Sequence, residues 1–351
     1  MANKYEQLYD FRIATIEDVD DIMKFIHVEW GDNHILAHDR ALFVWQYGCS
    51  EYGDNKTINV VLMTEKSGQI VGMIGFIPYS DNKKHLHIST AITKISSKNI
   101  MPMAGIELMR RQTVLVGEEA NFASGTNPNT ILPIFERIFK HKVGIMQQYY
   151  ILNESISTYR VAVPNREEYN NSFQPSGYTL VEVDTFAGLC EKYDLNEIND
   201  HMSIKSPNYI KKRFFEHPYY LYRKWVLADE EGKGVGVIFG REITVAQTRI
   251  LRFVDYRGNL AHLEKLGTAL HNLINEENYE YVDLMASDLT KVKMRDAGFN
   301  LLNPDGDAVI PHYFEPYIQR NIKNYYQTNY DLVIFKADGD QDRPNKRKGG
   351  K

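Results

Sequence analysis

The chain contains 351 residues, of which 43% are hydrophobic and 25% are charged, and its 41 basic and 46 acidic side chains give a net charge of −5. This balance excludes disorder over the whole chain, and at ~150 residues per domain the length predicts two domains. The slight negative charge argues against an overall nucleic-acid-binding surface. Cys49 and Cys190 are too few for a disulfide framework or a cysteine zinc site. The polar N-terminus lacks a signal-peptide core and no apolar run approaches ~20 residues, so we expect a cytoplasmic protein without membrane insertion.

The first half of the chain alternates strand-like and helix-like patterns. Thr15 can cap a helix whose apolar residues Val19, Ile22 and Ile26 fall on one face. Further helices are expected over 40–47, 104–116 and 131–139, and strands over 11–14, 58–64, 70–79, 85–95, 121–124, 144–152 and 158–163.

A polar, turn-rich segment over 164–176 marks the expected domain boundary, and the pattern restarts after it. Helices are then expected over 209–215, 260–274 and 289–297, and strands over 224–228, 235–241, 249–255, 281–286 and 332–336. These patterns predict one domain over 1–165, a second over 177–337 and a flexible polar tail over 338–351.

The two halves repeat one pattern. When Val71-Gly72 is aligned with Val235-Gly236, the preceding hairpins match without gaps, and Gly68 falls on Gly232. The order around each hairpin also repeats, with a helix before it and strand, helix, strand and helix after it. We therefore expect two domains of one kind.

That order of elements, with Val-Gly at the start of the third strand, resembles the GNAT acyltransferase fold. The resemblance implies an α/β (α+β) chain of two tandem GNAT-like domains, each a mixed, mostly antiparallel sheet flanked by helices. In this family a splayed pair of central strands admits the pantetheine arm of acyl-CoA, and a turn at a helix N-terminus binds the pyrophosphate. It implies coenzyme A as co-substrate and no metal.

The segment over 96–105 is the turn that this resemblance assigns to coenzyme A in the first half. Ala104-Gly105 fits the family pattern, whereas Pro102 stands where a glycine is usual. The corresponding segment over 257–263 lacks the small residues of the family pattern, so we expect the first half to bind acyl-CoA. The expected cofactor-binding residues are Ile95, Ser96, Ser97, Lys98, Asn99, Met101, Pro102, Met103, Ala104, Gly105 and Asn129.

The tyrosine that often protonates the departing thiolate in this family would fall near Phe135 or Met294. Neither side chain can donate a proton, which leaves this role to water or another side chain. The resemblance also implies that a backbone amide near Ile92 to Ile95 holds the oxyanion.

A narrower resemblance comes from Trp30-Gly31-Asp32-Asn33-His34, Asp39-Arg40, and the segments over 311–316 and 338–345. These are similar to segments of sugar N-acyltransferases of bacterial surface-polysaccharide synthesis. The resemblance implies acylation of the amine of a nucleotide-linked amino sugar, of the dTDP-3-amino-3,6-dideoxyhexose type. The implied donor is acetyl-CoA or 3-hydroxybutyryl-CoA.

His34 is the first candidate for the general base, because an imidazole can take the proton that a sugar ammonium must lose. Asp255 is the second. For three of the other candidates a structural role is the alternative: Trp30 as a core anchor, Asp39 as a helix cap and Arg252 as the ion-pair partner of Asp255. The expected substrate-binding residues are Trp30, Asp32, Asp39, Arg252, Tyr256, His312 and Tyr313.

His85 and His87 share one face of a strand, and we interpret them as a surface pair rather than a metal site. Two other functions stay open. One is a Fem-type transferase that uses aminoacyl-tRNA, and the other is a degenerate GNAT pair that binds without catalysis. The acyl chain, the sugar epimer and the oligomeric state are left open as well.

Overall fold

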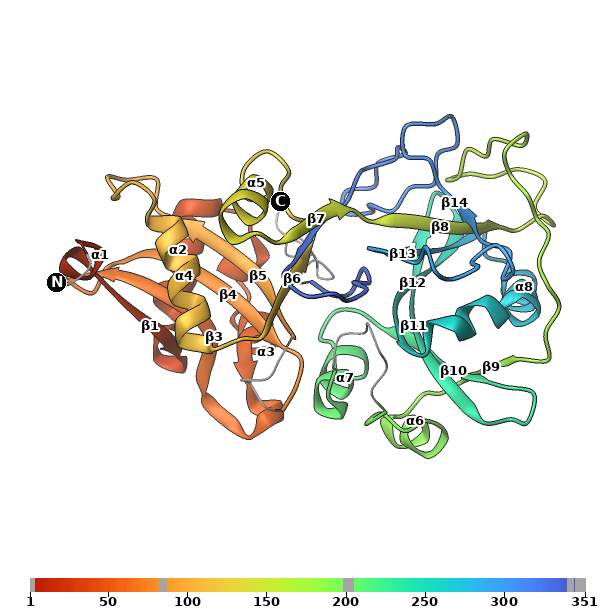
Figure 1. Cartoon of the computed structure of the whole chain (residues 1–351), viewed down its shortest axis with the longest axis horizontal. Coiled ribbons are helices and arrows are strands. Elements are labelled where there is room, and N and C mark those ends of the chain that lie inside the picture. Colours follow the sequence, from red (N-terminus) through yellow and green to blue (C-terminus); the bar gives the residue numbers. More distant parts are fainter. Residues whose placement is uncertain (1–3, 82–86, 198–204, 340–343, 345–351) are drawn as a thin grey trace.

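A computed structural model describes residues 4–81, 87–197, 205–339 and 344 of the chain. Two twisted sheets lie next to each other along the long axis of the molecule, each with helices packed on it (Figure 1). Antiparallel pairs dominate both sheets. The expected mixed, mostly antiparallel α/β architecture is therefore confirmed.

The first sheet has the strand order β1-β3-β4-β5-β6-β15-β7, with β2 paired to β3. Its strands are β1 (Tyr9–Thr15), β2 (Gly48–Cys49), β3 (Asp54–Glu65), β4 (Ile70–Pro78), β5 (His87–Ile95), β6 (Ala120–Ser124), β7 (Lys142–Ile145) and β15 (Tyr325–Thr328). Its helices are α1 (Lys4–Leu8), α2 (Val19–Trp30), α3 (Arg40–Tyr47), α4 (Ala104–Val116) and α5 (Leu132–Ile134), which continues as a π-helical turn over Phe135–Phe139.

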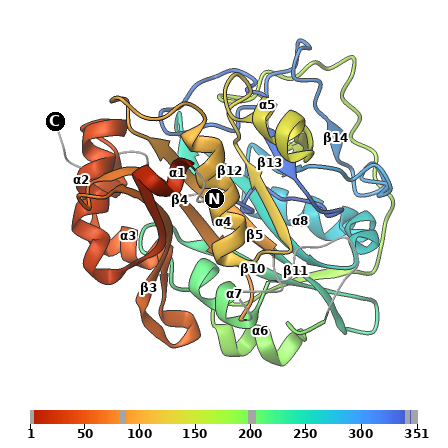
Figure 2. The ribbon, with the colours of Figure 1, turned by 60° about the vertical axis from the view of Figure 1, so that its left-hand side comes forward.

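Helices cover both faces of the first sheet. Along β3, Val60 and Leu62 pack with the residues of α2 and α3, whereas Val61 and Met63 pack with those of α4. Because side chains alternate between the faces of a strand, this run is apolar at every position rather than at every second one. Figure 2 shows α4 in front of the first sheet and α2 and α3 at its other side.

The second sheet has the order β14-β8-β13-β12-β11-β10-β9. Its strands are β8 (Gln147–Leu152), β9 (Thr179–Glu182), β10 (Tyr222–Ala228), β11 (Gly234–Val245), β12 (Thr248–Gly258), β13 (Tyr281–Ala286) and β14 (Asn300–Leu301). Its helices are α6 (Phe186–Lys192), α7 (Pro207–Phe214) and α8 (Gly267–Glu276), and a 3-10 helix covers Leu260–Lys265.

The two sheets exchange strands. Met146 alone separates β7 of the first sheet from β8 of the second, and the chain runs straight from one sheet into the other (Figure 1). Near the C-terminus, β15 returns to the first sheet and pairs with β6 and β7. The sheets therefore do not divide at the expected boundary over 164–176, because 147–152 belongs to the second sheet and 325–328 to the first.

Three expected elements are absent from the described chain. The segment over 289–297 forms turns instead of a helix, because the Asp288 side chain accepts from the amide and hydroxyl of Thr290 and starts a turn there. Single bridges, Val163 to Val309 and Ala286 to Phe335, replace the strands expected over 158–163 and 332–336.

Residue 338, the first residue of the expected flexible tail, is held by specific contacts. Asp338 is fully buried, and its carboxylate pairs with Lys205 at 2.7 Å. A buried ion pair holds this residue in place although its sequence surroundings are polar and rich in turn formers. The rest of the expected tail, apart from Gly339 and Pro344, and His85 lie outside the described residues.

Each sheet contains the same irregularity at the same place. The β4–β5 register shifts between Gly75 and Phe76, and the β11–β12 register shifts between Phe239 and Gly240. In both sheets the bulged strand then pairs in parallel with the next strand over three residues only, 87–89 with 120–122 and 251–253 with 282–284. The repeat seen in the sequence is therefore a repeat of supersecondary structure.

The halves share one buried core. Tyr79, which follows β4, and Phe122 on β6 lie in the same apolar cluster as Phe214 on α7 and Phe239 on β11. The segment that leads into α7 binds the first half directly, since the Ser206 amide donates to the Tyr79 carbonyl at 2.7 Å.

Candidate functional site

Two diverging strands form the centre of the candidate site. Beyond Ser89 and Phe122, β5 and β6 have no further paired residues, although β5 continues to Ile95. We call the region between these diverging strands the first wedge. The corresponding region between β12 and β13, beyond Phe253 and Leu284, is the second wedge.

The C-terminal segment fills the second wedge. The amide of Ala337 donates to Val254 on β12 at 2.9 Å, and the amide of Lys336 donates to Met285 on β13 at 3.1 Å. Ile334 and Phe335 are fully buried at the same place. Across the first wedge, no segment of the described chain makes backbone hydrogen bonds to both β5 and β6 in this way.

The start of α8 is covered as well. A Cβ added to Gly267 would come within 2.8 Å of Phe173 and 2.9 Å of the Gln174 carbonyl. The Ser176 amide donates to Thr268 Oγ1 at 3.0 Å, and the Ser176 hydroxyl donates to the Lys265 carbonyl at 2.5 Å. The linker after the first half therefore occupies the position at which the second helix N-terminus would meet an anion.

The turn between β5 and α4 already binds an anionic group of the chain. Glu29, near the end of α2, accepts from the Ser97 amide at 2.8 Å, from the Ser97 hydroxyl at 2.9 Å and from the Ser96 hydroxyl at 3.0 Å. The hydrogen bond from the Ser97 amide lowers the pKa of Glu29 below its usual value. Three donors thus converge on one carboxylate beside the first wedge.

The rest of this turn is shaped by specific contacts. Tyr9 accepts from the Met101 amide at 3.1 Å, and the Tyr5 hydroxyl donates to the Pro102 carbonyl at 2.9 Å. Met103 has φ of 67°, a left-handed conformation that is uncommon outside glycine, and its carbonyl accepts from the amides of Ile106 and Glu107. Met103 is 59% exposed at the start of α4.

The expected cofactor-binding residues lie at the end of β5, on the turn before α4, at the start of α4 and on the turn before α5. Ile95, Ile100 and Met101 pack in the same apolar cluster as Ile131 and Ile134 of the α5 segment. Most of the turn residues are exposed or half-buried, namely Ser96, Ser97, Lys98, Asn99, Pro102, Met103 and Gly105, and Ala104 is buried. Asn129 is exposed on the separate turn before α5, where its amide donates to Asn127 Oδ1 at 2.9 Å.

The loop after α2 connects the first half to the second. The Trp30 and His34 rings lie 5.1 Å apart, and Trp30 is 41% exposed, so it is not a core anchor. Asp32 is exposed and lies 3.8 Å from the imidazole of His27. Asp39 caps α3 by accepting from the Leu42 amide at 2.9 Å, and it also accepts from the Tyr219 hydroxyl of the second half.

Arg252 does not pair with Asp255. Its guanidinium makes two hydrogen bonds to Asp283 on β13, at 2.6 and 3.0 Å, and donates to the His312 carbonyl. Arg252 is 6% exposed and Asp283 is 1% exposed. The alternative of an Arg252–Asp255 pair is therefore wrong, because residues 252 and 283 lie opposite each other on the parallel strands β12 and β13.

Asp255 pairs with Lys205, with 2.6 Å from Nζ to each carboxylate oxygen. Lys205 also binds Asp338, and all three side chains are buried. Burial raises the pKa of Asp255 to about 6, against the opposing effect of Lys205. The sequence did not point to Lys205, since it lies far from both carboxylates along the chain.

Two of the other candidates for substrate binding are enclosed. Tyr256 is fully buried, and its hydroxyl donates to the Asn259 carbonyl at 2.9 Å. His312 is 4% exposed, its Nε2 lies 2.5 Å from the Ile322 carbonyl, and burial lowers its pKa to about 3. Tyr313 next to it is half-buried.

Within the part of the chain that the structure describes, no three His, Cys, Asp or Glu side chains form a group that could hold a metal ion. No helix of these residues is long and apolar enough to cross a membrane.

The fold has relatives among solved structures. A GCN5-related N-acetyltransferase from Anabaena variabilis is similar with a TM-score of 0.55 and 12% sequence identity, covering 91% of this chain and 72% of that one. A probable N-acyltransferase from Enterococcus faecalis is similar with a TM-score of 0.54 and 11% identity, covering 92% and 73%. No protein-family model and no curated protein matches the sequence. The likeness shows that the chain has the GNAT fold.

Proposed function

We propose that this protein is an N-acyltransferase that moves an acyl group from acyl-CoA to an amine, with acyl-CoA in the first wedge. The contrast between the two wedges carries this proposal. The chain itself fills the second wedge with residues 334–337 and covers the start of α8 with the linker around Phe173. The turn before α4 instead presents donors that already hold the Glu29 carboxylate.

In the proposed reaction, the neutral amine attacks the thioester carbonyl. The register shift between β4 and β5 is a bulge at Ala91. Thr90 and Ile92 each pair with a residue of β4, whereas Ala91 between them has no paired residue there. Beyond Ser89, β5 also has no partner on the β6 side, so its amides on that edge are available to a ligand. We assign the amide of Ile92 or a neighbour to the oxyanion, where a fixed donor stabilises the developing charge.

We propose a nucleotide-linked amino-deoxy sugar as the acceptor, probed first as a dTDP-linked 3-amino-3,6-dideoxyhexose. The resemblance of the segments over 30–34, 39–40 and 311–316 supports this choice, with acetyl-CoA or 3-hydroxybutyryl-CoA as donor. The hydrogen bond from the Tyr219 hydroxyl to Asp39 also supports this choice, because it brings the loop after α2 to the second half.

His34 is the proposed base that removes the first proton of the sugar ammonium. Asp255 is less suited, because both of its carboxylate oxygens bind Lys205 in the core. His34→Ala should lower kcat at least tenfold and leave the Kd for acyl-CoA within about twofold, because general base catalysis contributes ~10²–10⁴. Unchanged kcat would remove His34 from the mechanism.

The reaction class is tested by release of coenzyme A, followed with a free-thiol reagent. The two donors would be offered against dTDP- and UDP-linked amino sugars, and a parallel assay would offer aminoacyl-tRNA. Coenzyme A release that depends on one amino sugar is the expected result. Product formation from aminoacyl-tRNA alone would favour the Fem-type alternative, and binding of coenzyme A without turnover on any acceptor would favour a binding module.

A matched pair of variants tests which half binds acyl-CoA. Met103→Glu places a negative charge at the exposed start of α4, and Ala261→Glu places one at the exposed start of the corresponding segment in the second half. We expect Met103→Glu to weaken coenzyme A binding at least tenfold in calorimetry, whereas Ala261→Glu should leave it unchanged. The reverse pattern would assign the donor to the second half.

A further inference from the structure

The first wedge has a closed end and an open end. The closed end is the last pair of the β5–β6 ladder, Ser89 with Phe122, and we call it the vertex. The open end lies at the turn between β5 and α4, where Ser97 holds Glu29. In the proposed function the diphosphate of coenzyme A lies at that turn and the thioester carbonyl lies at the amide of Ile92. The pantetheine arm therefore runs inward from the turn, and the acyl group beyond the sulfur points toward the vertex.

The spacing along β5 sets the room for this acyl group. Ile92 and Ser89 are three positions apart on the strand, which at ~3.3 Å per residue is ~10 Å. A contact distance of ~4 Å to the first atoms of the vertex leaves ~6 Å, which is room for about four carbon atoms at ~1.5 Å per bond. An acetyl or 3-hydroxybutyryl group fits this length, and an octanoyl group exceeds it.

On the face toward the second half, the vertex is filled by an aromatic ring. Phe122 is fully buried, and the fully buried ring of Tyr79 lies against it, with 5.4 Å between the ring centroids and 70° between the ring planes. Both rings belong to one apolar cluster with Val254 and Met285 of the second half. Because a close-packed interior does not accept extra methylene groups without displacing side chains, a longer acyl chain would have to move the Phe122 ring.

On the opposite face, the vertex is closed by hydrogen-bonded amides. Asn121 precedes Phe122 on β6, so its side chain lies on the other face of the sheet. Its Oδ1 accepts from Gln327 Nε2 on β15 at 2.9 Å, and Gln327 Oε1 is bonded to His141 in turn. Asn121 is 5% exposed and Gln327 is fully buried. An alkyl chain that entered this face would break hydrogen bonds of buried groups, which is costly.

We propose that Phe122 is a specificity-determining residue that restricts the donor to short-chain acyl-CoA; this rests on the proposed N-acyltransferase function. The Phe122 ring meets the end of the acyl chain and excludes longer chains by their size. It acts on the unreactive end of the acyl group, so it selects the donor and takes no part in the transfer itself.

The length limit is tested by calorimetry with coenzyme A, butyryl-CoA and octanoyl-CoA, which needs no acceptor. Wild type should bind octanoyl-CoA at least tenfold more weakly than butyryl-CoA, because even one surplus methylene in a closed apolar pocket typically lowers selectivity by ~10-fold or more. Equal Kd values for the two acyl-CoA compounds would overturn the proposal.

The residue is tested with Phe122→Ala and a matched control, Phe299→Ala. Phe299 is also a buried phenylalanine, but it lies in the separate core cluster around α8 of the second half. The ratio of the octanoyl-CoA Kd to the butyryl-CoA Kd should fall at least fivefold in Phe122→Ala and stay within twofold of wild type in Phe299→Ala. A ratio that is unchanged in Phe122→Ala, or that falls equally in both variants, would overturn the role of Phe122.

Two features keep this experiment decisive. A ratio of two Kd values does not depend on the folded fraction of a variant, and Phe122→Leu, which leaves a smaller space, should change the ratio in the same direction if the alanine variant does not fold. Wild type that binds none of the three compounds would contradict the proposed function and this inference with it. Wild type that binds all three equally well would contradict the length limit alone.

Discussion

Arg252 and Asp283 form a buried ion pair whose two members depend on each other. Removing one partner of such a pair costs ~3–5 kcal/mol, since the other charge stays buried without compensation. We therefore expect Asp283→Asn to lower the free energy of unfolding in urea by about that amount. The double variant Arg252→Met/Asp283→Leu should recover most of the loss. Wild-type stability of Asp283→Asn would instead point to a ligand-binding role for Arg252.

Lys205 stands between two buried carboxylates, so its neighbours respond differently to substitution. Asp255→Asn leaves a neutral Lys205–Asp338 pair and should be tolerated at pH 7. Lys205→Met leaves both carboxylates without a cation and should cost ~3–5 kcal/mol in urea unfolding. Equal losses in the two variants would contradict this account of the cluster.

The same cluster predicts a pH dependence. The pKa of Asp255 is about 6 in the folded chain against an ordinary value of 3.8, so the folded chain binds this proton more tightly. Its contribution to stability is complete below pH 3.8 and is lost as the pH rises through about 6. The stability of wild type relative to Asp255→Asn should therefore fall from pH 4 to pH 7 in urea titrations. A difference that does not change with pH would reject the raised pKa.

Some residue roles were open to prediction from sequence and others were not. An aspartate before an apolar helix predicts a cap, and Asp39 is one. The partner of Arg252 required the register of two parallel strands, because Asp283 lies 31 positions away. The π-helical turn over Phe135–Phe139 was not open to prediction either, because apolar periodicity does not indicate it.

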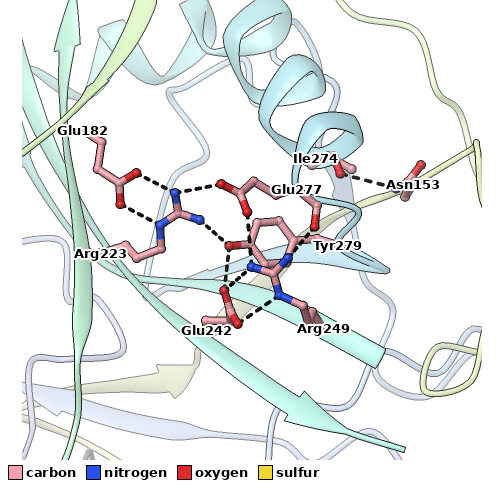
Figure 3. Close-up of polar contacts among 8 residues, drawn as sticks. All are labelled: Asn153, Glu182, Arg223, Glu242, Arg249, Ile274, Glu277 and Tyr279. Carbon is pink, nitrogen blue, oxygen red and sulfur yellow. Dashed lines mark hydrogen bonds and ion pairs between the residues drawn. The ribbon is translucent and has the colours of Figure 1, made fainter. Parts of the chain in front are cut away.

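Among the elements, the edge of the second sheet is tied by a charged network (Figure 3). Arg223 on β10 lies between Glu182 and Glu277, and Arg249 on β12 lies between Glu242 and Glu277. The network joins five segments that follow one another along the chain, namely β9, β10, β11, β12 and the end of α8.

This network should be sensitive to acid and to salt. Hydrogen bonds from Arg249 lower the pKa of Glu242 below its usual value, so the stabilisation is present above pH ~4.5 and is lost as the pH falls below it. Glu242→Gln should cost ~1 kcal/mol at pH 7 in low salt and less in 1 M NaCl, because the side chains are partly exposed. The cost should also be smaller at pH 3 than at pH 7, because protonation removes the charge of Glu242. Chemical unfolding of the variant and wild type across these conditions measures it. A loss that is equal at pH 3 and pH 7 would contradict it.

Elements with a strong hydrophobic pattern in the sequence were predictable, whereas strands that form only because they pair with distant strands were not. The β10–β11 and β3–β4 hairpins follow from apolar runs around acidic turns with glycine. The strand β15 consists of Tyr325–Thr328 in a segment rich in tyrosine and asparagine, and it exists because it pairs with β6 and β7. The segment over 332–336 has a stronger apolar pattern than β15. It nevertheless forms no regular strand and lies in the second wedge.

For the whole molecule, the two wedges predict how much ligand binds. Since residues 334–337 occupy the second wedge through hydrogen bonds to β12 and β13, one chain should bind one coenzyme A. Isothermal titration with coenzyme A should give a stoichiometry of one. A value of two would show that the C-terminal segment can be displaced. A stoichiometry of one in wild type and zero in Met103→Glu would support both this prediction and the choice of half.

The pairing of β15 with β6 and β7 also affects how the protein is made on the ribosome. The first sheet lacks the strand between β6 and β7 until Tyr325–Thr328 has left the exit tunnel, long after β7 at Lys142–Ile145. At typical synthesis rates this delay is roughly ten to forty seconds. During that time β6 and β7 expose open edges that can pair with other nascent chains. We therefore expect a chaperone to bind the chain early in synthesis and to dissociate once β15 has paired with β6 and β7.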